Sequence, residues 1–223
     1  MLTVHHLNNS RSQRVLWLLE ELGVPYDIVR YERDPKTMLA PESLKRIHPL
    51  GKSPVITEDG QTIAETGAII EYVLDRYGEG RLIPGRGTPE HLRFVYWLHH
   101  AEGSAMTPLL LKLVFGRIAE QPAPFFVRPV LKQVAARVQQ MLVDPQLALH
   151  IGYWENELGK HEWFAGDAFT AADIQMSFPV EAAASRARFD GKYPKLRAFL
   201  DRIHARTAYR RALERGGPYS YAS

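Results

Sequence analysis

Residues 51–66 contain the side chains whose types and spacing point most clearly to a binding site. The stretch reads as a β-hairpin, with the turn signal Asp59-Gly60 between two short apolar runs. Pro54 opens the first run, where a proline removes a backbone donor and leaves an unpaired edge. Glu65 and Thr66 open a helix after the second run, and a helix start offers free N–H groups to an anion. Together these features predict a docking site for a small peptide that carries a carboxylate.

A second group of polar side chains, Asn9-Ser10-Arg11, forms a turn between an apolar β-type run and an amphipathic helix. A polar turn between a strand and a helix is a common position for reactive side chains in proteins. In a βαβαββα domain, the loop after the first strand lies at the same sheet edge as the loop before the third strand and the start of the last helix. We therefore expect residues 9–11 to lie near Lys52, Ser53 and Thr66.

The chain contains no cysteine. A protein thiolate nucleophile and a dithiol redox centre are therefore both excluded. Any thiol chemistry must be supplied by a bound ligand.

The elements that must position these residues follow from the spacing of apolar residues. Alternation and β-type runs predict strands, and apolar residues at i, i+3, i+4 and i+7 predict helices. The first two strands are connected through a helix, which makes their pairing parallel. The expected order over residues 1–78 is strand 2–7, helix 15–22, strand 25–31, short helix 41–47, strands 55–58 and 61–64, and helix 68–77.

Residues 79–88 are rich in glycine and proline and mark the best boundary in the sequence. Everything beyond it reads as helical, so the sequence predicts an α/β domain over 1–78, a linker over 79–88 and an all-helical domain over 89–223. Thr107-Pro108 is expected to bend the first long helix of that domain. Thr170 and Asp173 resemble a capping box. The expected helices are 89–115, 127–142, 147–158, 174–184 and 196–203, followed by a polar tail.

Four segments together resemble the glutathione S-transferase family, most closely a fungal and bacterial branch with a hydroxyl-bearing first turn. The resemblance covers nearly the whole chain in the right order. It implies a thioredoxin-like N-terminal domain that binds glutathione and an all-helical C-terminal domain that walls the electrophile pocket. The segments are residues 8–17 (NNSRSQRVLW), 48–56 (HPLGKSPVI), 64–70 (AETGAII) and 164–173 (FAGDAFTAAD).

The resemblance implies a role for each residue of the hairpin region. The residue before the family's cis-proline, here Ser53 before Pro54, pairs through its backbone with the cysteinyl part of glutathione. Many relatives have valine there, a change that a backbone contact tolerates. The hydroxyl and amide of Thr66 take the γ-glutamyl carboxylate, and Glu65 takes the ammonium group. Lys52 is placed to reach the glycyl carboxylate.

The residue that activates the thiol is left open among three. Counted back from Gly23, the usual hydroxyl position of the family falls on Asn9, and Ser10 follows one residue later. The Asn9 amide, the Ser10 hydroxyl or the Arg11 side chain could each donate to the thiolate and lower its pKa. Lowering a thiol pKa from about 8.5 to about 6.5 requires roughly 2.7 kcal/mol. A hydrogen bond to a charged group supplies about 1.5 to 3 kcal/mol, so one good donor suffices.

The resemblance also implies the reaction and the assembly. Bound glutathione is the co-substrate, and its thiolate attacks a hydrophobic electrophile or a peroxide in the cleft between the domains. Met106 and Leu110 are the expected wall of the electrophile pocket, and a homodimer is expected. The competing interpretation is a non-catalytic glutathione-binding or scaffold protein that keeps the fold, since fold does not imply function.

Composition argues against several other classes. A net charge of +3 makes no electrostatic case for nucleic acid, and Arg202, Arg206 and Arg210 are interpreted as a solvated helix face. No apolar run approaches eighteen residues, so no membrane span is expected. Residues 1–6 lack the features of a signal peptide, so a cytoplasmic location is expected. His5-His6, His99-His100 and Glu102 are the candidate metal ligands, but no metal site is expected, because adjacent histidines on a strand or helix point to different sides.

Overall fold

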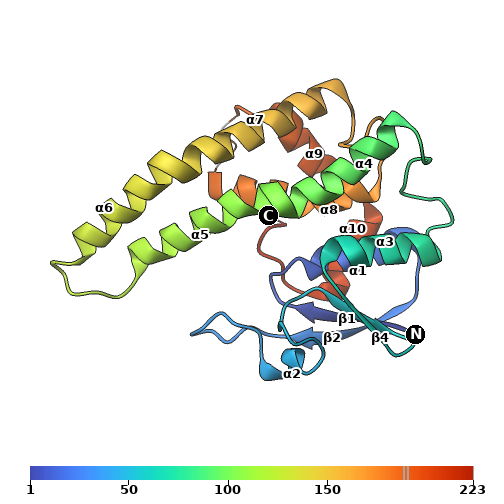
Figure 1. Ribbon diagram of the computed structural model, residues 1–223, viewed down its shortest axis with the longest axis horizontal. Helices are drawn as coiled ribbons and strands as arrows, with labels where there is room; N and C mark the ends of the chain where they lie inside the picture. The colour runs from blue at the N-terminus through green and yellow to red at the C-terminus, as the bar shows by residue number, and fades with distance from the viewer. Residues whose placement is uncertain (188, 190, 223) are drawn as a thin grey trace.

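A computed structural model describes residues 1–187, 189 and 191–222. Its first part is built on a four-stranded mixed sheet in the order β2-β1-β3-β4 (Figure 1). β1 runs parallel to β2, as predicted, and antiparallel to β3. The predicted order of strands and helices is therefore confirmed. The strands are β1 (Leu2–Leu7), β2 (Tyr26–Tyr31), β3 (Val55–Glu58) and β4 (Gln61–Ala64).

The free backbone near Pro54 does not lie on an edge strand. β3 is an inner strand, because it pairs with β1 on one side and with β4 on the other. Pairing with both neighbours begins at Val55, one residue after the proline. The predicted unpaired edge is therefore wrong for the strand as a whole, and the available backbone is the segment just before it, Ser53-Pro54.

Helices α1 and α3 pack against each other and cover one face of the sheet, and α2 lies on the other side (Figure 1). The remaining helices form the second part of the chain. The helices of the first part are α1 (Ser12–Leu22), α2 (Glu42–Lys45) and α3 (Thr66–Tyr77). Those of the second are α4 (Pro89–His100), α5 (Met106–Glu120), α6 (Arg128–Val138), α7 (Asp144–Lys160), α8 (Ala171–Ala187), α9 (Pro194–Ala205) and α10 (Thr207–Gly216).

Two π-helical turns interrupt the long helices, η1 at Ala101–Ala105 between α4 and α5 and η2 at Gln139–Val143 between α6 and α7. The sequence predicted a bend at Thr107-Pro108, and the structure instead has the π-helical turn η1 a few residues earlier in the chain. A proline has no N–H to bond to the carbonyl four residues earlier. The change of hydrogen-bond pattern immediately before Pro108 lets α5 continue through it.

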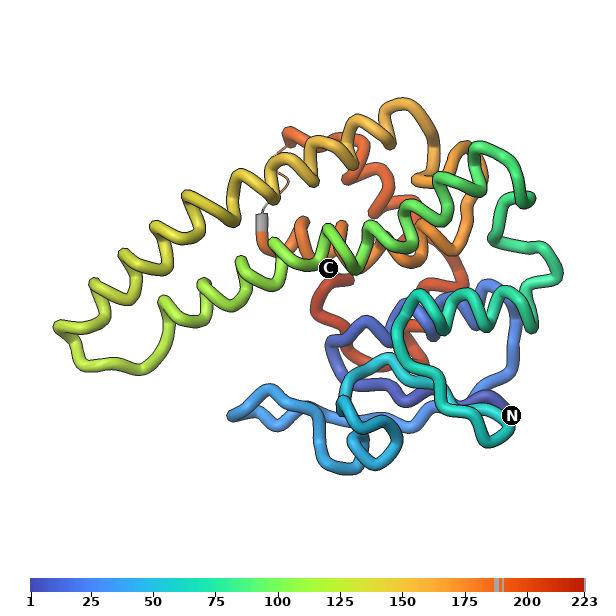
Figure 2. The backbone as a smooth tube through the Cα atoms, in the orientation of Figure 1, coloured from blue at the N-terminus to red at the C-terminus, as the bar shows by residue number. Residues whose placement is uncertain are grey.

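α5 and α6 form a hairpin that projects from the rest of the molecule (Figure 2). The sequence predicted one helix over residues 127–142. In the structure Val130, Val134 and Leu142 are exposed, and Ala135 is the buried residue of α6. The predicted single helix is interrupted, because α6 ends at Val138 and the π-helical turn η2 follows it. No helix among the described residues combines the length and apolar composition that crossing a bilayer requires.

α10 lies where the sequence predicted a polar tail. One narrow face of this mostly polar helix, formed by Ala208, Tyr209 and Ala212, is buried, and the helix packs against α1. Arg206 ends α9 and forms a two-bond ion pair with Glu21, at 2.6 and 2.9 Å. The predicted single arginine face is therefore wrong, because the helix breaks at its middle residue.

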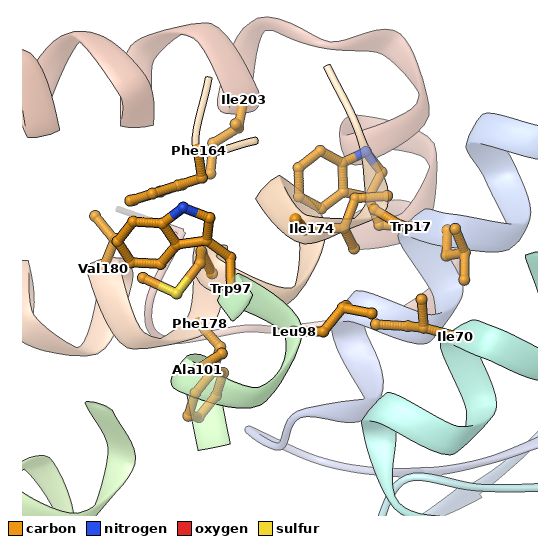
Figure 3. Packing of buried hydrophobic residues seen from close by; sticks show 14 of the residues in the cluster. Trp17, Ile70, Trp97, Leu98, Ala101, Phe164, Ile174, Phe178, Val180 and Ile203 are labelled. Carbon is orange, nitrogen blue, oxygen red and sulfur yellow. The ribbon is translucent and has the colours of Figure 1, made fainter. Parts of the chain in front are cut away.

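One apolar core joins the two parts of the chain. Trp17 and Ile70 come from α1 and α3, whereas Trp97, Phe164 and Ile174 come from the second part, and all lie within one layer of packed side chains (Figure 3). The predicted capping box at the start of α8 forms in part, because the Thr170 hydroxyl accepts from the Ala172 amide over 3.2 Å and not from that of Asp173. Asp173 accepts from the backbone N–H groups of Thr170 and Phe164, each at 2.8 Å, and so ties α8 to the preceding loop.

Candidate functional site

The turn after β1 lies directly against Ser53 and Pro54. The Ser53 hydroxyl donates to the His5 carbonyl over 3.0 Å and accepts from the Leu7 amide over 3.3 Å. Its oxygen lies 3.4 Å from the Ser10 hydroxyl oxygen. The peptide bond between Ser53 and Pro54 is cis. The structure thus brings the two segments together as the sequence predicted.

Ser10 belongs to a buried chain of hydroxyl groups beneath that turn. The Ser10 and Ser12 oxygens are 2.7 Å apart, and the Ser12 oxygen lies 2.8 Å from His6 Nδ1. Burial and the nearby Arg30 charge together lower the pKa of His6 to about 4, against an opposing contribution from the backbone of Gly216. His6 is therefore a neutral imidazole at physiological pH.

The N-terminus of α3 is open to an anion. Glu65 precedes the helix with φ 68° and ψ 124°, and its own side chain makes no capping hydrogen bond to the first turn. A non-glycine residue rarely adopts such a positive φ. Thr66 is buried as the first residue of the helix. The first N–H groups of a helix lack intrahelical partners, so this end is suited to a carboxylate.

Arg14 lies behind Thr66, entirely inside the protein, with 1% of its surface exposed. Its guanidinium donates to the Thr66 hydroxyl over 3.4 Å and to the Gln175 carbonyl over 2.5 Å, and it pairs with Glu102. Burial alone would raise the pKa of Glu102, but the charges of Arg14 and Arg11 hold it below its usual value. One buried cation thus connects α1, α3, η1 and α8.

Arg11 shares the same carboxylate, with its Nε 3.0 Å from Glu102 Oε2. Both arginines also lie over the face of Phe178, each 5.4 Å from the ring centre. Two guanidinium groups therefore face one carboxylate, which leaves a net positive charge beside the turn. Such a charge favours the ionised form of a nearby thiol.

The other two predicted polar residues differ in how they are held. Asn9 has φ 47°, and its Oδ1 accepts a hydrogen bond from the backbone N–H of Ser220 over 2.8 Å. Lys52 is exposed, and no hydrogen bond or ion pair to it is found within residues 1–187, 189 and 191–222. Asn9 is thus held in place by a distant segment, whereas Lys52 is free to reach a ligand.

The two predicted pocket residues lie on α5 in different environments. Met106 is buried within the core cluster, and Leu110 is 52% exposed. Arg186 of α8 donates to the carbonyl of Leu109 over 3.0 Å and to the Tyr221 hydroxyl over 2.9 Å. The start of α5 is thereby joined to the segment that holds Asn9.

Sequence reasoning missed three residues that organise this region: Arg14, Glu102 and Ser220. Arg14 occupies a polar position in an amphipathic helix, where an exposed arginine is the ordinary expectation. Glu102 and Ser220 come from segments far away in the chain, and no local pattern predicts their contacts. The adjacent His5 and His6 are both buried and bond to different partners, Tyr31 for His5 and Ser12 for His6.

Two family models match the chain: residues 10–76 match the glutathione S-transferase N-terminal domain, and residues 123–207 match the C-terminal domain. Glutathione S-transferase 3 of Schizosaccharomyces pombe is 34% identical and covers 96% of this chain and 88% of its own length. Glutathione S-transferase 1 of Saccharomyces cerevisiae is 31% identical over 96% of this chain and 95% of its own.

Solved structures give the same picture. A glutathione S-transferase from Actinobacillus pleuropneumoniae superposes with a TM-score of 0.79 at 31% identity, covering 100% of this chain and 96% of its own. A sphingomonad glutathione S-transferase, solved in complex with glutathione, has the same fold with a TM-score of 0.73 at 22% identity, covering 96% of this chain and 98% of its own. By sequence along nearly its whole length and by fold, this chain belongs to the glutathione S-transferase family.

Proposed function

We propose that this glutathione transferase binds glutathione along Ser53-Pro54 and the start of α3, and ionises its thiol at the turn Asn9-Ser10-Arg11. The observation that carries the proposal is the convergence of these three segments. Ser10 lies 3.4 Å from Ser53, and Arg14, on the helix that follows the turn, lies 3.4 Å from Thr66. A ligand held by Ser53-Pro54 and by the start of α3 would therefore have its middle part over the turn Asn9-Ser10-Arg11.

The binding half of the site follows from the charges of glutathione. The γ-glutamyl carboxylate is taken by the hydroxyl and amide of Thr66 at the open N-terminus of α3, with the buried Arg14 cation behind the hydroxyl. The exposed Glu65 carboxylate takes the ammonium group. Lys52 takes the glycyl carboxylate at the other end, as an exposed ion pair worth about 1 kcal/mol or less.

The activating half of the site must lower the thiol pKa. The net positive charge of Arg11, Arg14 and Glu102 lies beside the turn and favours the thiolate. A hydrogen bond from the turn adds about 1.5 to 3 kcal/mol, against the roughly 2.7 kcal/mol needed for a shift of two pKa units. The thiolate then attacks an electrophilic carbon of a hydrophobic substrate, and the protein forms no covalent bond of its own.

The substrate side of the reaction is assigned to the surface beside the start of α5. Leu110 exposes an apolar side chain there, and Met106 supports it from the core. Exposed apolar residues on α5 and α6, Leu111, Val114, Val130 and Val134, also support a homodimer in which a second copy covers part of this surface. Sedimentation of the purified protein measures that assembly state directly.

The central test is an ultraviolet titration of the thiolate in the complex with glutathione, alongside conjugation to an electrophilic aryl halide. We expect a thiol pKa about two units below that of free glutathione, together with conjugation activity. A protein that binds glutathione but leaves its thiol pKa unchanged would instead be a non-catalytic binding protein. Failure to bind glutathione at all would reject the site.

A further inference from the structure

We propose that the direct donor to the thiolate is the Asn9 amide, and that the main-chain N–H of Ser220 positions it. This inference rests on the function proposed above. It gives a role to the tail segment, residues 217–222, which leaves α10 and returns to the turn after β1 (Figure 1).

The contact with Ser220 fixes which way the Asn9 amide points. A backbone N–H can only donate, so the atom 2.8 Å from it must be the side-chain oxygen. The amide nitrogen, which carries two N–H donors, therefore faces away from the tail segment. Within the described part of the chain, that nitrogen has no hydrogen-bond acceptor. The side-chain NH₂ group of Asn9 is thus held in one orientation and is available to donate to a ligand.

Ser10, in contrast, has its proton committed inward. We assign the single N–H of the neutral His6 ring to the Gly216 backbone, whose interaction raises the pKa of His6, so that Nδ1 is the acceptor and takes the Ser12 proton over 2.8 Å. Ser12 has no second proton, so the 2.7 Å bond between Ser12 and Ser10 must be donated by Ser10. The Ser10 hydroxyl can accept from the site but has no proton left to stabilise a thiolate.

The tail segment is anchored firmly enough to position a side chain. The Tyr219 hydroxyl donates to Glu181 over 2.7 Å, and Tyr209 donates to the same carboxylate over 2.6 Å. Burial and the Glu181 charge both raise the pKa of Tyr219, so its phenol stays protonated. Tyr221 packs on Phe178 with ring centres 5.3 Å apart, next to the two arginines of the site. Ser220 lies between these two anchors.

Arg11 is left with a supporting role. Its guanidinium is paired with Glu102 and lies over the ring of Phe178, and these two contacts set its orientation. Arg11 therefore contributes positive charge and is not the direct donor. The donor and the charge therefore come from neighbouring residues that are held by different parts of the chain.

The experiment measures the thiol pKa of bound glutathione in variants of the full chain. Asn9→Ala is expected to raise it by about one unit, and Ser220→Pro, which removes the main-chain N–H, by at least half as much. Ser220→Ala retains the N–H and should restore the wild-type thiol pKa. In the Asn9→Ala background, Ser220→Pro should add nothing, because the two residues act through one contact.

A second variant tests the anchor without altering the backbone. Tyr219→Phe removes the hydroxyl bonded to Glu181, and it should raise the thiol pKa when Asn9 is present and not when it is alanine. Equal shifts for Ser220→Pro and Ser220→Ala, or a full shift that persists in Asn9→Ala, would overturn the role of the tail segment. A larger rise for Ser10→Ala than for Asn9→Ala would overturn the choice of donor. If wild-type protein leaves the thiol pKa unchanged, the proposed function itself fails.

Discussion

The guanidinium of Arg14 lies beneath the hydroxyl of Thr66, with 3.4 Å between Nη2 and Oγ1, and the same nitrogen pairs with Glu102. A buried cation therefore supports the point where a carboxylate is expected to bind. Because its other partners are on η1 and α8, the ligand site and the helical part of the molecule share one interaction network.

Removing this cation should destabilise the fold. Arg14→Met leaves a largely buried carboxylate without its main partner, and breaking such a pair costs about 3 to 5 kcal/mol. The free energy of unfolding in urea measures the loss. Arg11→Met is the matched control, because Arg11 pairs with the same carboxylate but is one-third exposed, and we expect a loss below about 1 kcal/mol. Equal losses in the two variants would contradict the structural role of Arg14.

The hydroxyl of Thr66 should contribute to glutathione affinity. Thr66→Val keeps the shape and removes a hydrogen bond to a carboxylate, so the dissociation constant should rise by about tenfold to a hundredfold. Thr66→Ser keeps the hydroxyl and should bind within about threefold of wild type. Calorimetric titration with glutathione measures both. Unchanged affinity in the valine variant would remove Thr66 from the site.

Lys52 should matter only to ligands that have the glycyl carboxylate. Lys52→Ala is expected to weaken glutathione a few-fold, with a smaller effect at high salt because an exposed pair is screened. γ-Glutamylcysteine, which lacks glycine, should bind the variant and the wild type equally. A loss of affinity for both ligands would show that Lys52 acts elsewhere in the site.

The buried His6 should make stability depend on pH. Its pKa of about 4 in the folded protein lies below the ordinary 6.5, so unfolding takes up a proton between these values. Its contribution is fully present above pH 6.5 and is lost as the pH falls toward 4. The stability gap between wild type and His6→Gln should therefore shrink by up to about 1.4 kcal/mol per pH unit in this window.

Urea unfolding at several pH values tests this dependence. His99→Gln, at an exposed position, is the control for replacing a histidine by glutamine elsewhere in the chain. His100 is also buried, with a pKa lowered to about 4, chiefly by burial and also by His150. Asp173 opposes both histidines, since burial raises its pKa to about 6 despite its hydrogen bonds. The difference between wild type and variant isolates His6, and a constant gap for His6→Gln would mean that this ring titrates normally.

The sheet could be predicted from the sequence because its signals are local. Strands 55–58 and 61–64 match the structure residue for residue, since an Asp-Gly turn and β-type runs specify both ends. The convergence of the turn 9–11 with Ser53 also followed, because strand order alone fixes which loops meet. The division at residues 79–88, the cytoplasmic location and the roles of the individual site residues stay predictions.

The supporting contacts could not be predicted, since each depends on segments distant in sequence. α10 was missed because its buried stripe consists of small residues and one tyrosine within a highly charged segment. The pairing of Arg14 with Glu102 spans 88 positions, and neither residue belongs to an apolar pattern. Whether a hydroxyl such as that of Ser10 faces a ligand or the interior depends on the atoms below it, which a single sequence does not reveal.

The two π-helical turns affect how mutations can alter the helical part of the chain. A π turn carries one residue more than the α-helix it interrupts, and one residue corresponds to about 100° of helical rotation. Deleting Gly103 would restore a regular helix through η1 and turn α5 by about that angle relative to α4. The exposed Leu110 would then face a different side of the molecule. The number of residues in η1, as much as their identity, thus decides which side chains of α5 face the side proposed to bind the substrate.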